Sequence, residues 1–307
     1  MVKRLELEST APFQGLPELV ARDEGLFAAE GLEVEFVRRG ENAPKQADRS
    51  ITDPTLLNPF GSHGSSLETG KAAMFNACEW GNYHRVETSA TGGRQLGRRA
   101  IIAYGAIVVP PWSEIYTPQQ LANVPVGVSY YAGPHYLALL MLEGFLPRDA
   151  IVTCLAPNGA GLRFRALMNR ELDATVLTEP HITVAERAGC RVILEAGFHG
   201  TEVATADVDA ETYRAFNRAI REAVRRINAD KRKYLQYFLD YHRDEPEVAA
   251  LTVDDLRPSR LVVTDPAPIP EEEARRTAEW MRSWGLLGDI SYQELCDVER
   301  QAVAHQA

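Results

Sequence analysis

The sequence lacks two features that would each define a class of protein. It has no apolar run long enough for a secretory signal or a membrane-spanning helix, and it opens instead on MVKRLELEST. It also has no basic excess, since 33 Lys and Arg stand against 43 Asp and Glu, for a net charge of -10 at pH 7. We therefore expect no nucleic-acid partner and no membrane insertion. The expected location is cytoplasmic, or periplasmic if an export signal has been trimmed from the sequence.

Cysteine pairs and cofactor motifs are missing as well. The four cysteines form no CxxC pair, which argues against a disulfide framework or a zinc knuckle: Cys78, Cys154, Cys190 and Cys296. The chain has no HExxH or HxH motif for a metal. TGGRQLG at 91–97 follows no clear strand, as a nucleotide-binding glycine loop would. We expect neither a metal nor another cofactor.

What the sequence does have is a repeating alternation of strand and helix patterns. With 307 residues and 45% hydrophobic content, the chain is long enough for two lobes with real cores. Strands are expected at 5–8, 32–36, 73–77, 99–109, 124–129, 151–155, 174–177 and 191–195, with helices at 16–30, 65–70, 133–143, 162–170 and 180–188. This order is typical of an α/β protein with a mostly parallel sheet.

The pattern changes after Gly200. Long amphipathic helices are expected at 210–227, 231–242, 271–284 and 291–302, and a strand pattern recurs only near 260–263. We expect this carboxyl third to wrap a finished sheet. The polar stretch 39–59 has no periodicity and is expected to be a long loop.

The segment MFNACEWGNYHR, at 74–85, places reactive side chains at the end of the third strand. Cys78 is either a nucleophile or a small buried filler. Glu79 is either a general acid or base, with a pKa raised by burial, or a cap of the following helix. Trp80 either stacks on an aromatic ligand or packs within its lobe. One of His84 and Arg85, one turn further on, can reach a ligand carboxylate.

Two further segments carry candidate site residues. His63 lies in FGSHGSS, where it is either a proton-transfer group or a surface histidine. YYAGPHY, at 130–136, brings Tyr130, Tyr131 and His135 to the start of a helix, where amides and hydroxyls can bind an anion.

Four segments together resemble a known fold: GLPELVARDEGLFAAEGLEVEFV (15–37), SEIYTPQQLANVPVGV (113–128), LRFRALMNRELDATVLTEP (162–180) and TAEWMRSWGLL (277–287). Their order resembles the type II periplasmic binding protein fold, in the branch of sulfonate-binding and nitrate-binding proteins and thiamine-pyrimidine precursor synthases. The resemblance implies two lobes joined by hinge strands, near 99–103 and 196–201, with a helical carboxyl-terminal region. Lobe I would hold 1–103, lobe II 104–197, and 198–307 would return to lobe I.

The same resemblance implies that a small organic anion binds between the lobes, where strand ends and helix starts converge. The loops expected to face this cleft are 10–14, 63–66, 78–85, 130–136, 158–161, 178–181 and 199–201. They add Phe13, Gln14 and Glu179 to the candidate binding residues. Arg165, after NGAG, either bridges the lobes or forms an exposed salt bridge.

Two functions fit these expectations. The first is a cytosolic lyase that decarboxylates or desulfinates an aromatic or heteroaromatic acid, because CEWGNYHR resembles the acidic residue and tyrosine-containing helix of dihydroxyphthalate decarboxylases. Glu79, Cys78 or His63 would then protonate the ring carbon. Related biphenyl sulfinate desulfinases carry a cysteine in the loop after the first strand, but TAPFQG here has none. The alternative is an ABC-transporter-type solute-binding protein or a ligand sensor.

Overall fold

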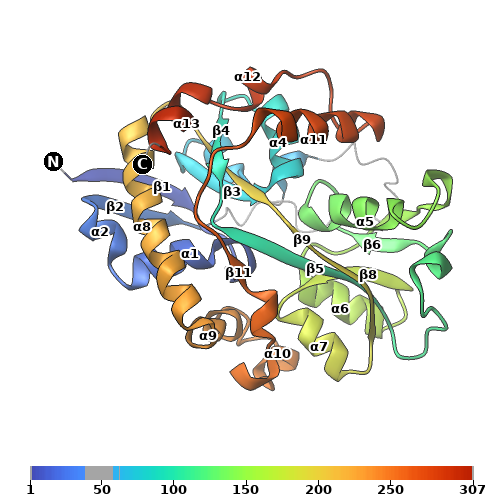
Figure 1. The fold of residues 1–307 in the computed structure, drawn as a ribbon. Coiled ribbons are helices and arrows are strands. Elements are labelled where there is room, and N and C mark those ends of the chain that lie inside the picture. The colour runs from blue at the N-terminus through green and yellow to red at the C-terminus, as the bar shows by residue number, and fades with distance from the viewer. Residues whose placement is uncertain (1, 39–57, 62, 306–307) are drawn as a thin grey trace.

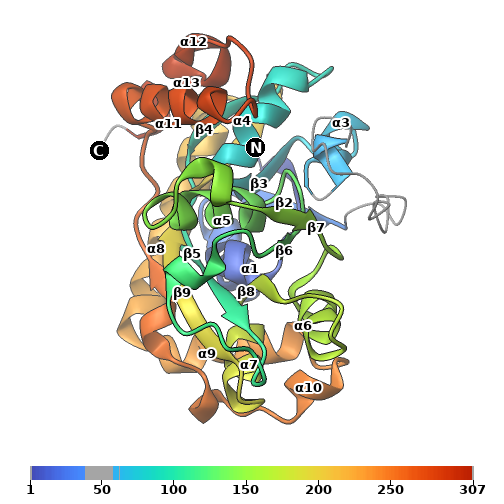
Figure 2. The ribbon, with the colours of Figure 1, turned by 90° about the vertical axis from the view of Figure 1, so that its right-hand side faces the viewer.

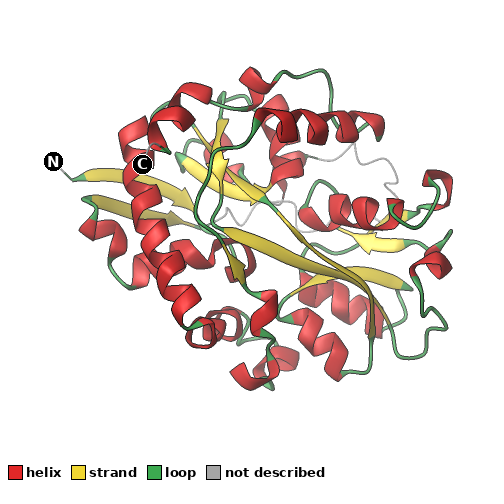
Figure 3. Cartoon of the chain, viewed as in Figure 1, coloured by secondary structure: helices red, strands yellow, loops and turns green. Residues whose placement is uncertain are grey.

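Two β-sheets with helices packed around them make up the chain (Figures 1 and 3). The structure is a computed structural model that describes residues 2–38, 58–61 and 63–305. Most of the loop expected at 39–59 lies outside the described residues. Within the described ranges, no helix combines the length and the apolar character needed to cross a membrane.

The first sheet has the strand order β2-β1-β3-β10-β4. Its strands are β1 (Lys3–Glu8), β2 (Leu32–Val37), β3 (Met74–Cys78), β4 (Arg94–Arg98) and β10 (Gly200–Ala204). β1 is parallel to β2 and β3, whereas β10 is antiparallel to β3 and β4. Four helices accompany these strands: α1 (Pro12–Asp23), α2 (Leu26–Ala29), α3 (Ser65–Glu68) and α4 (Glu79–Thr88).

The second sheet has the order β11-β5-β8-β6-β7, and β9 pairs with β5. Its strands are β5 (Ile101–Val109), β6 (Val126–Val128), β7 (Thr153–Leu155), β8 (Ala174–Thr178), β9 (Arg191–Phe198) and β11 (Val262–Val263). Its helices are α5 (Gly133–Glu143), α6 (Ala160–Met168) and α7 (His181–Arg187). β6 is parallel to β7 and β8, but β5 is antiparallel to β8, β9 and β11. Both sheets are therefore mixed, and the prediction of a mostly parallel sheet is wrong, because the strands that link the two sheets run against their neighbours.

Two direct links between the sheets lie close to the predicted crossing positions. β4 leads into β5 through Arg99 and Ala100, and β9 leads into β10 through His199. The long strands β5 and β9 are antiparallel neighbours from Ala103 opposite Phe198 to Val109 opposite Arg191 (Figure 1). The two links therefore run side by side, while their role as hinges stays a prediction.

After β10, which was not predicted, the described part of the carboxyl third adds helices and the short strand β11, at the place where a strand pattern was predicted. These helices are α8 (Ala210–Ala229), α9 (Lys231–Tyr241), α10 (Pro246–Ala249), α11 (Glu271–Ser283), α12 (Tyr292–Leu295) and α13 (Val298–Ala304). α8 packs on α1, α2 and α13. α10 lies beside α7 of the second sheet (Figures 1 and 2).

Two strands, β4 and β10, were not expected, and two expected helices are each divided: 16–30 into α1 and α2, and 291–302 into α12 and α13. The first break falls at Glu24 and Gly25, where Gly25 has a φ of 71° that does not continue a helix. The second falls at Cys296, because the Asp297 carboxylate accepts a hydrogen bond from the Arg300 amide and caps a new helix.

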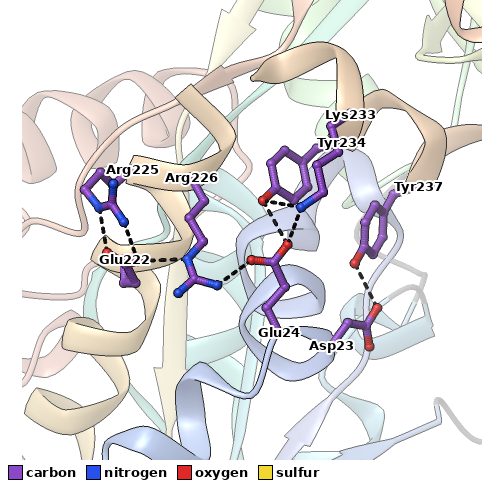
Figure 4. A network of polar contacts seen from close by, with 8 residues as sticks. All are labelled: Asp23, Glu24, Glu222, Arg225, Arg226, Lys233, Tyr234 and Tyr237. Atoms are coloured by element: carbon purple, nitrogen blue, oxygen red, sulfur yellow. Dashed lines mark hydrogen bonds and ion pairs between the residues drawn. The ribbon is translucent and has the colours of Figure 1, made fainter. Parts of the chain in front are cut away.

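A polar network joins the end of α1 to α8 and α9 (Figure 4). The Glu24 carboxylate accepts hydrogen bonds from Arg226 Nη1 at 2.7 Å, Lys233 Nζ at 2.8 Å and the Tyr234 hydroxyl at 2.9 Å. These donors, Lys233 foremost, lower the pKa of Glu24 to about 2. The network fixes the position of α9, and the carboxyl end of α9 reaches the cavity described next.

Candidate functional site

A cavity of about 220 Å³ lies where the loops of both sheets meet the end of α9. Its lining residues are Ala11, Phe13, Gln14 and His63 beside the first sheet, Ala132, Gly133, Pro134, Asn158, Gly159, Ala160, Arg163 and Thr178 beside the second, and Tyr241 and His242 at the end of α9. Loops expected at 10–14, 130–136 and 158–161 all contribute to this wall.

Three helices begin at the cavity. Ala11, Ala132 and Gly159 are the residues at which α1, α5 and α6 start, and all three line the cavity wall. The first turn of a helix leaves backbone amides without intrahelical acceptors and carries a partial positive charge. Their convergence favours a carboxylate, sulfonate or phosphate group in the cavity.

Arg163, in the second turn of α6, adds a full positive charge to this wall. Its Nε donates to the Val176 carbonyl at 2.9 Å, and its Nη1 donates to Ser129 Oγ at 2.8 Å and to the Pro157 carbonyl at 3.2 Å. All these acceptors are neutral, and no carboxylate of the described residues pairs with Arg163. Burial lowers the pKa of Arg163 to about 10, which leaves the guanidinium charged at neutral pH. A buried cation without a counter-ion, in the wall of a cavity, is suited to hold an anionic ligand.

Two predicted residues on the opposite wall are held by contacts behind them. The Gln14 Oε1 accepts a 2.6 Å hydrogen bond from Nη1 of Arg99, the buried residue at one strand crossing. His63 precedes Gly64, and the Glu8 carboxylate accepts from the amides of Gly64 and Ser66, both at 2.8 Å. The cavity wall is thus tied to the end of β1 and to the crossing strand.

The residues that follow β3 pack behind the cavity and are not part of its lining. Trp80 contacts Phe198, Tyr136 and Trp280, with ring centroids 5.5, 6.0 and 6.3 Å away. The Glu79 carboxylate accepts a 2.6 Å hydrogen bond from the Tyr83 hydroxyl, and burial raises its pKa.

Cys78 also lies behind the wall, as a β-carbon placed on Gly133 would be 3.6 Å from its own. Burial raises the pKa of the Cys78 thiol, although the nearby Arg85 guanidinium opposes this rise. The proposed chemical roles of Cys78 and Glu79 stay predictions.

The other predicted binding residues have partners within the fold. Tyr131 stacks on His84, with ring centroids 4.4 Å apart, and the Tyr130 hydroxyl donates to the Thr153 carbonyl at 3.3 Å. His135 is buried beside Tyr130, and burial lowers its pKa to about 3, so the ring is neutral.

Arg85 and Glu179 are the two charged members of the predicted set. The Arg85 guanidinium donates to the Pro59 and Tyr131 carbonyls at 2.9 and 3.0 Å. Glu179 accepts from Arg260 at 3.0 Å and from the Thr183 amide and hydroxyl, and burial raises its pKa. Neither residue is part of the cavity lining.

Sequence reasoning did not select Arg163, Tyr241 or His242 as site residues. Arg163 lies two residues after NGAG, so its place near a helix start was visible, whereas its lack of a carboxylate partner among the described residues was not. Tyr241 and His242 belong to the carboxyl end of a helix more than 60 residues from the nearest other part of the wall in the sequence.

One cluster beside the cavity has the donor atoms of a metal site. His181, His242 and Glu245 each offer one nitrogen or oxygen, and these atoms lie within 4.8 Å of one another. His242 is also part of the cavity lining.

Comparisons with known proteins identify the fold. No protein-family model and no curated protein sequence matches the chain. Among solved structures, the alkanesulfonate-binding protein SsuA from Xanthomonas axonopodis pv. citri bound to MOPS aligns with a TM-score of 0.69 and 13% identity, over 97% of this chain and 96% of that one. The chain has the periplasmic binding protein fold. This confirms the resemblance inferred from the four sequence segments.

Two further structures show how widely this fold is used. A ligand-binding component of an ABC-type import system from Staphylococcus aureus, with zinc bound, aligns with a TM-score of 0.71 and 10% identity, over 99% of this chain and all of that one. A mutant of the desulfurization enzyme DSZB in complex with biphenyl-2-sulfinic acid aligns with a TM-score of 0.60 and 14% identity, over 99% of both chains. A binding protein and an enzyme thus share the scaffold seen here.

The burial of Cys78 allows a prediction about the reactivity of its thiol. Because burial raises the thiol pKa and only 1% of the residue is exposed, Cys78 should resist alkylation in the folded chain at pH 8. Iodoacetamide treatment followed by peptide mass spectrometry checks this, with a sample unfolded in guanidinium as the control for full modification. Rapid modification of Cys78 in the folded chain would contradict the prediction and favour a nucleophilic role.

Proposed function

We propose that the chain binds a small organic anion between its two sheets and acts as a solute-binding protein or ligand sensor. The observation that carries this proposal is Arg163, a buried guanidinium in the cavity wall with only neutral acceptors around it. The helix starts at Ala11, Ala132 and Gly159 also favour a negatively charged ligand.

The other lining residues and the cavity volume indicate what the uncharged part of the ligand is like. Phe13, Pro134 and Tyr241 offer apolar and aromatic surface. A cavity of about 220 Å³ is below the ~300–1,000 Å³ of sites for drug-sized ligands. The proposed ligand is therefore a compact sulfonate, sulfinate or carboxylate with a small apolar body. The similar structures, which hold MOPS and biphenyl-2-sulfinic acid, support an acidic sulfur headgroup.

A second candidate is the lyase, and one observation favours it. His63 and His242 both line the cavity, so two groups able to transfer a proton face the proposed ligand. Decarboxylation or desulfination of an aromatic acid needs a proton delivered to the ring carbon as the bond to the leaving group breaks. A carboxylate then leaves as carbon dioxide, and a sulfinate leaves as sulfur dioxide, which water converts to sulfite. Of the three predicted proton donors, His63 lines the cavity, whereas Glu79 and Cys78 are not part of its lining.

A panel of ligands, followed by calorimetry and mass spectrometry, separates the candidates. The panel holds small alkane and aryl sulfonates, sulfinates and carboxylates, each matched with a neutral sulfonamide or amide of the same shape. We expect saturable binding of at least one anion and at least ~10-fold weaker binding of its neutral partner, because a charged hydrogen bond contributes about 1.5–3 kcal/mol.

The outcomes are distinct. Tight capture with unchanged ligand masses supports the receptor, and turnover that His63→Gln abolishes without weakening binding supports the lyase. Equal binding of anions and neutral partners, or no binding across the panel, would contradict the proposed function.

A further inference from the structure

We propose that His181, His242 and Glu245 form a binding site for a zinc ion at the edge of the cavity. This site goes beyond the proposed function, and it can exist whether or not an organic anion binds. Two imidazoles and one carboxylate are a donor set that zinc accepts, since imidazole nitrogen suits zinc and a carboxylate oxygen can complete its shell.

The three side chains already meet around one carboxylate. His181 Nε2 lies 3.0 Å from Glu245 Oε2, and His242 Nδ1 lies 2.6 Å from Glu245 Oε1. The two imidazole rings stand perpendicular, with centroids 4.8 Å apart. Zinc bonds to nitrogen and oxygen are about 2.0–2.2 Å long, so ligand atoms on a tetrahedral ion lie about 3.3 Å apart. Small side-chain rotations from the present positions therefore suffice to enclose an ion.

The fold holds these residues together from distant parts of the sequence. His181 is the first residue of α7, His242 caps the end of α9, and Glu245 precedes α10. The start of α6 closes in on them, because a β-carbon on Gly161 would lie 2.0 Å from Glu245 Oε2 and 2.8 Å from His181 Nε2. A side chain at position 161 would therefore displace the carboxylate, and glycine there keeps the cluster intact.

The geometry assigns one ligand atom to His181. The ring is fully buried, and its Nε2 is the nitrogen that faces the carboxylate, 3.0 Å from Glu245 Oε2. Nε2 is therefore the atom that His181 offers to the ion.

The positive charge of Arg165 lies close to the proposed site and should weaken zinc binding, which allows a test by substitution. Arg165 Nη1 lies 3.5 Å from Glu245 Oε2 and also pairs with Glu247. Because the Arg165 side chain is partly exposed, its charge is screened and it can turn towards Glu247 when zinc binds. Removing it should raise the affinity for zinc.

With only three protein ligands, the proposed ion would keep a coordination position for water or another donor. His242 belongs both to the cluster and to the cavity lining, so this position would be close to the cavity.

The experiment measures zinc alone. The intact chain is freed of metal with a chelator, dialysed against zinc chloride without any organic anion, and analysed for zinc by mass spectrometry. We expect one ion per chain, and visible absorption of a cobalt-substituted sample should report nitrogen and oxygen ligands. His242→Gln and Glu245→Gln should each weaken binding at least ~10-fold, since even loss of a partner behind a ligand costs 10- to 100-fold. Arg165→Gln should strengthen it about 3- to 10-fold.

His84→Gln is the matched control, because His84 also pairs with a glutamate, 3.5 Å from Glu87, but lies outside the cluster. It should leave zinc binding unchanged. If the unsubstituted chain takes up no more zinc than His242→Gln, or if His84→Gln loses as much, the three residues form an ionic contact only and the proposal is wrong. Neither result affects the anion-binding proposal, which is measured in the presence of a chelator.

Discussion

Replacing Arg163 by glutamine should weaken binding of the organic anion about 10- to 100-fold. A hydrogen bond to a charged group contributes about 1.5–3 kcal/mol, and each 1.4 kcal/mol is a factor of ten in affinity. The effect should approach the upper end because Arg163 is buried and no carboxylate in the described part of the chain pairs with it. Calorimetric titration with the best anion of the panel, in buffer with a chelator, measures the change.

Arg165→Gln is the control for this prediction. Arg165 lies two residues further along the same helix, pairs with Glu247 and is not part of the cavity lining. Its substitution should change the affinity by less than about twofold, because exposed ion pairs contribute little.

Arg163 also donates to Ser129 and to the Val176 carbonyl, so its loss can disturb the wall. The ratio between the anion and its neutral partner separates charge from disturbance. In Arg163→Gln this ratio should fall towards one, whereas Arg163→Lys should keep most of it. An unchanged ratio in Arg163→Gln would show that Arg163 does not hold the anion.

The sequence predicted the architecture better than the individual site residues. Alternating strand and helix patterns depend on local periodicity, and they placed β1, β3, β5 and β8 within a few residues of their observed positions. β4 and β10 were missed because RQLGR and GTEVA contain few apolar residues, and the two strands pair with each other from positions about 100 residues apart. Such strands owe their existence to long-range partners, which local patterns do not reveal.

The same limit applies to the candidate site. The many reactive side chains of MFNACEWGNYHR made residues 74–85 the main candidates. In the structure, however, Tyr83 donates a hydrogen bond to Glu79, and Arg85 donates to two backbone carbonyls. Arg163 looked ordinary in the sequence. What marks it is a missing partner, and a missing partner is a property of the folded chain.

Residues 78–80 show a second reason why the cavity lining could not be predicted from the sequence. The carboxyl end of β3 was correctly located, but the start of α5 covers it, with Gly133 against Phe198 and Cys78. The cavity therefore opens on the α5 side of this contact. Whether a strand end faces a cavity or a covering helix depends on lobe packing, which the sequence pattern does not encode.

Replacing Arg85 by methionine should lower the free energy of unfolding by about 3–5 kcal/mol. The Arg85 side chain is fully buried. Its Nε donates to the Pro59 carbonyl, its Nη2 to the Tyr131 carbonyl, and its Nη1 to Asn82 Oδ1 at 3.3 Å. Methionine fills similar space but leaves these acceptors without a donor, at about 1–3 kcal/mol for each buried group. Urea unfolding followed by circular dichroism measures the loss, which is a large part of the ~5–15 kcal/mol typical of a folded protein.

Arg225→Met provides the comparison, because Arg225 is exposed and pairs with Glu222 on its own helix. Its effect should stay within about 0.5 kcal/mol.

The same Arg85 variant tests the sequence-based prediction that Arg85 binds the ligand. Tyr131 has a backbone φ of 56° and leads into the start of α5 at Gly133, so the guanidinium acts on the cavity through the loop that it holds. A variant with unchanged stability and abolished anion binding would reverse this interpretation and place Arg85 on the ligand.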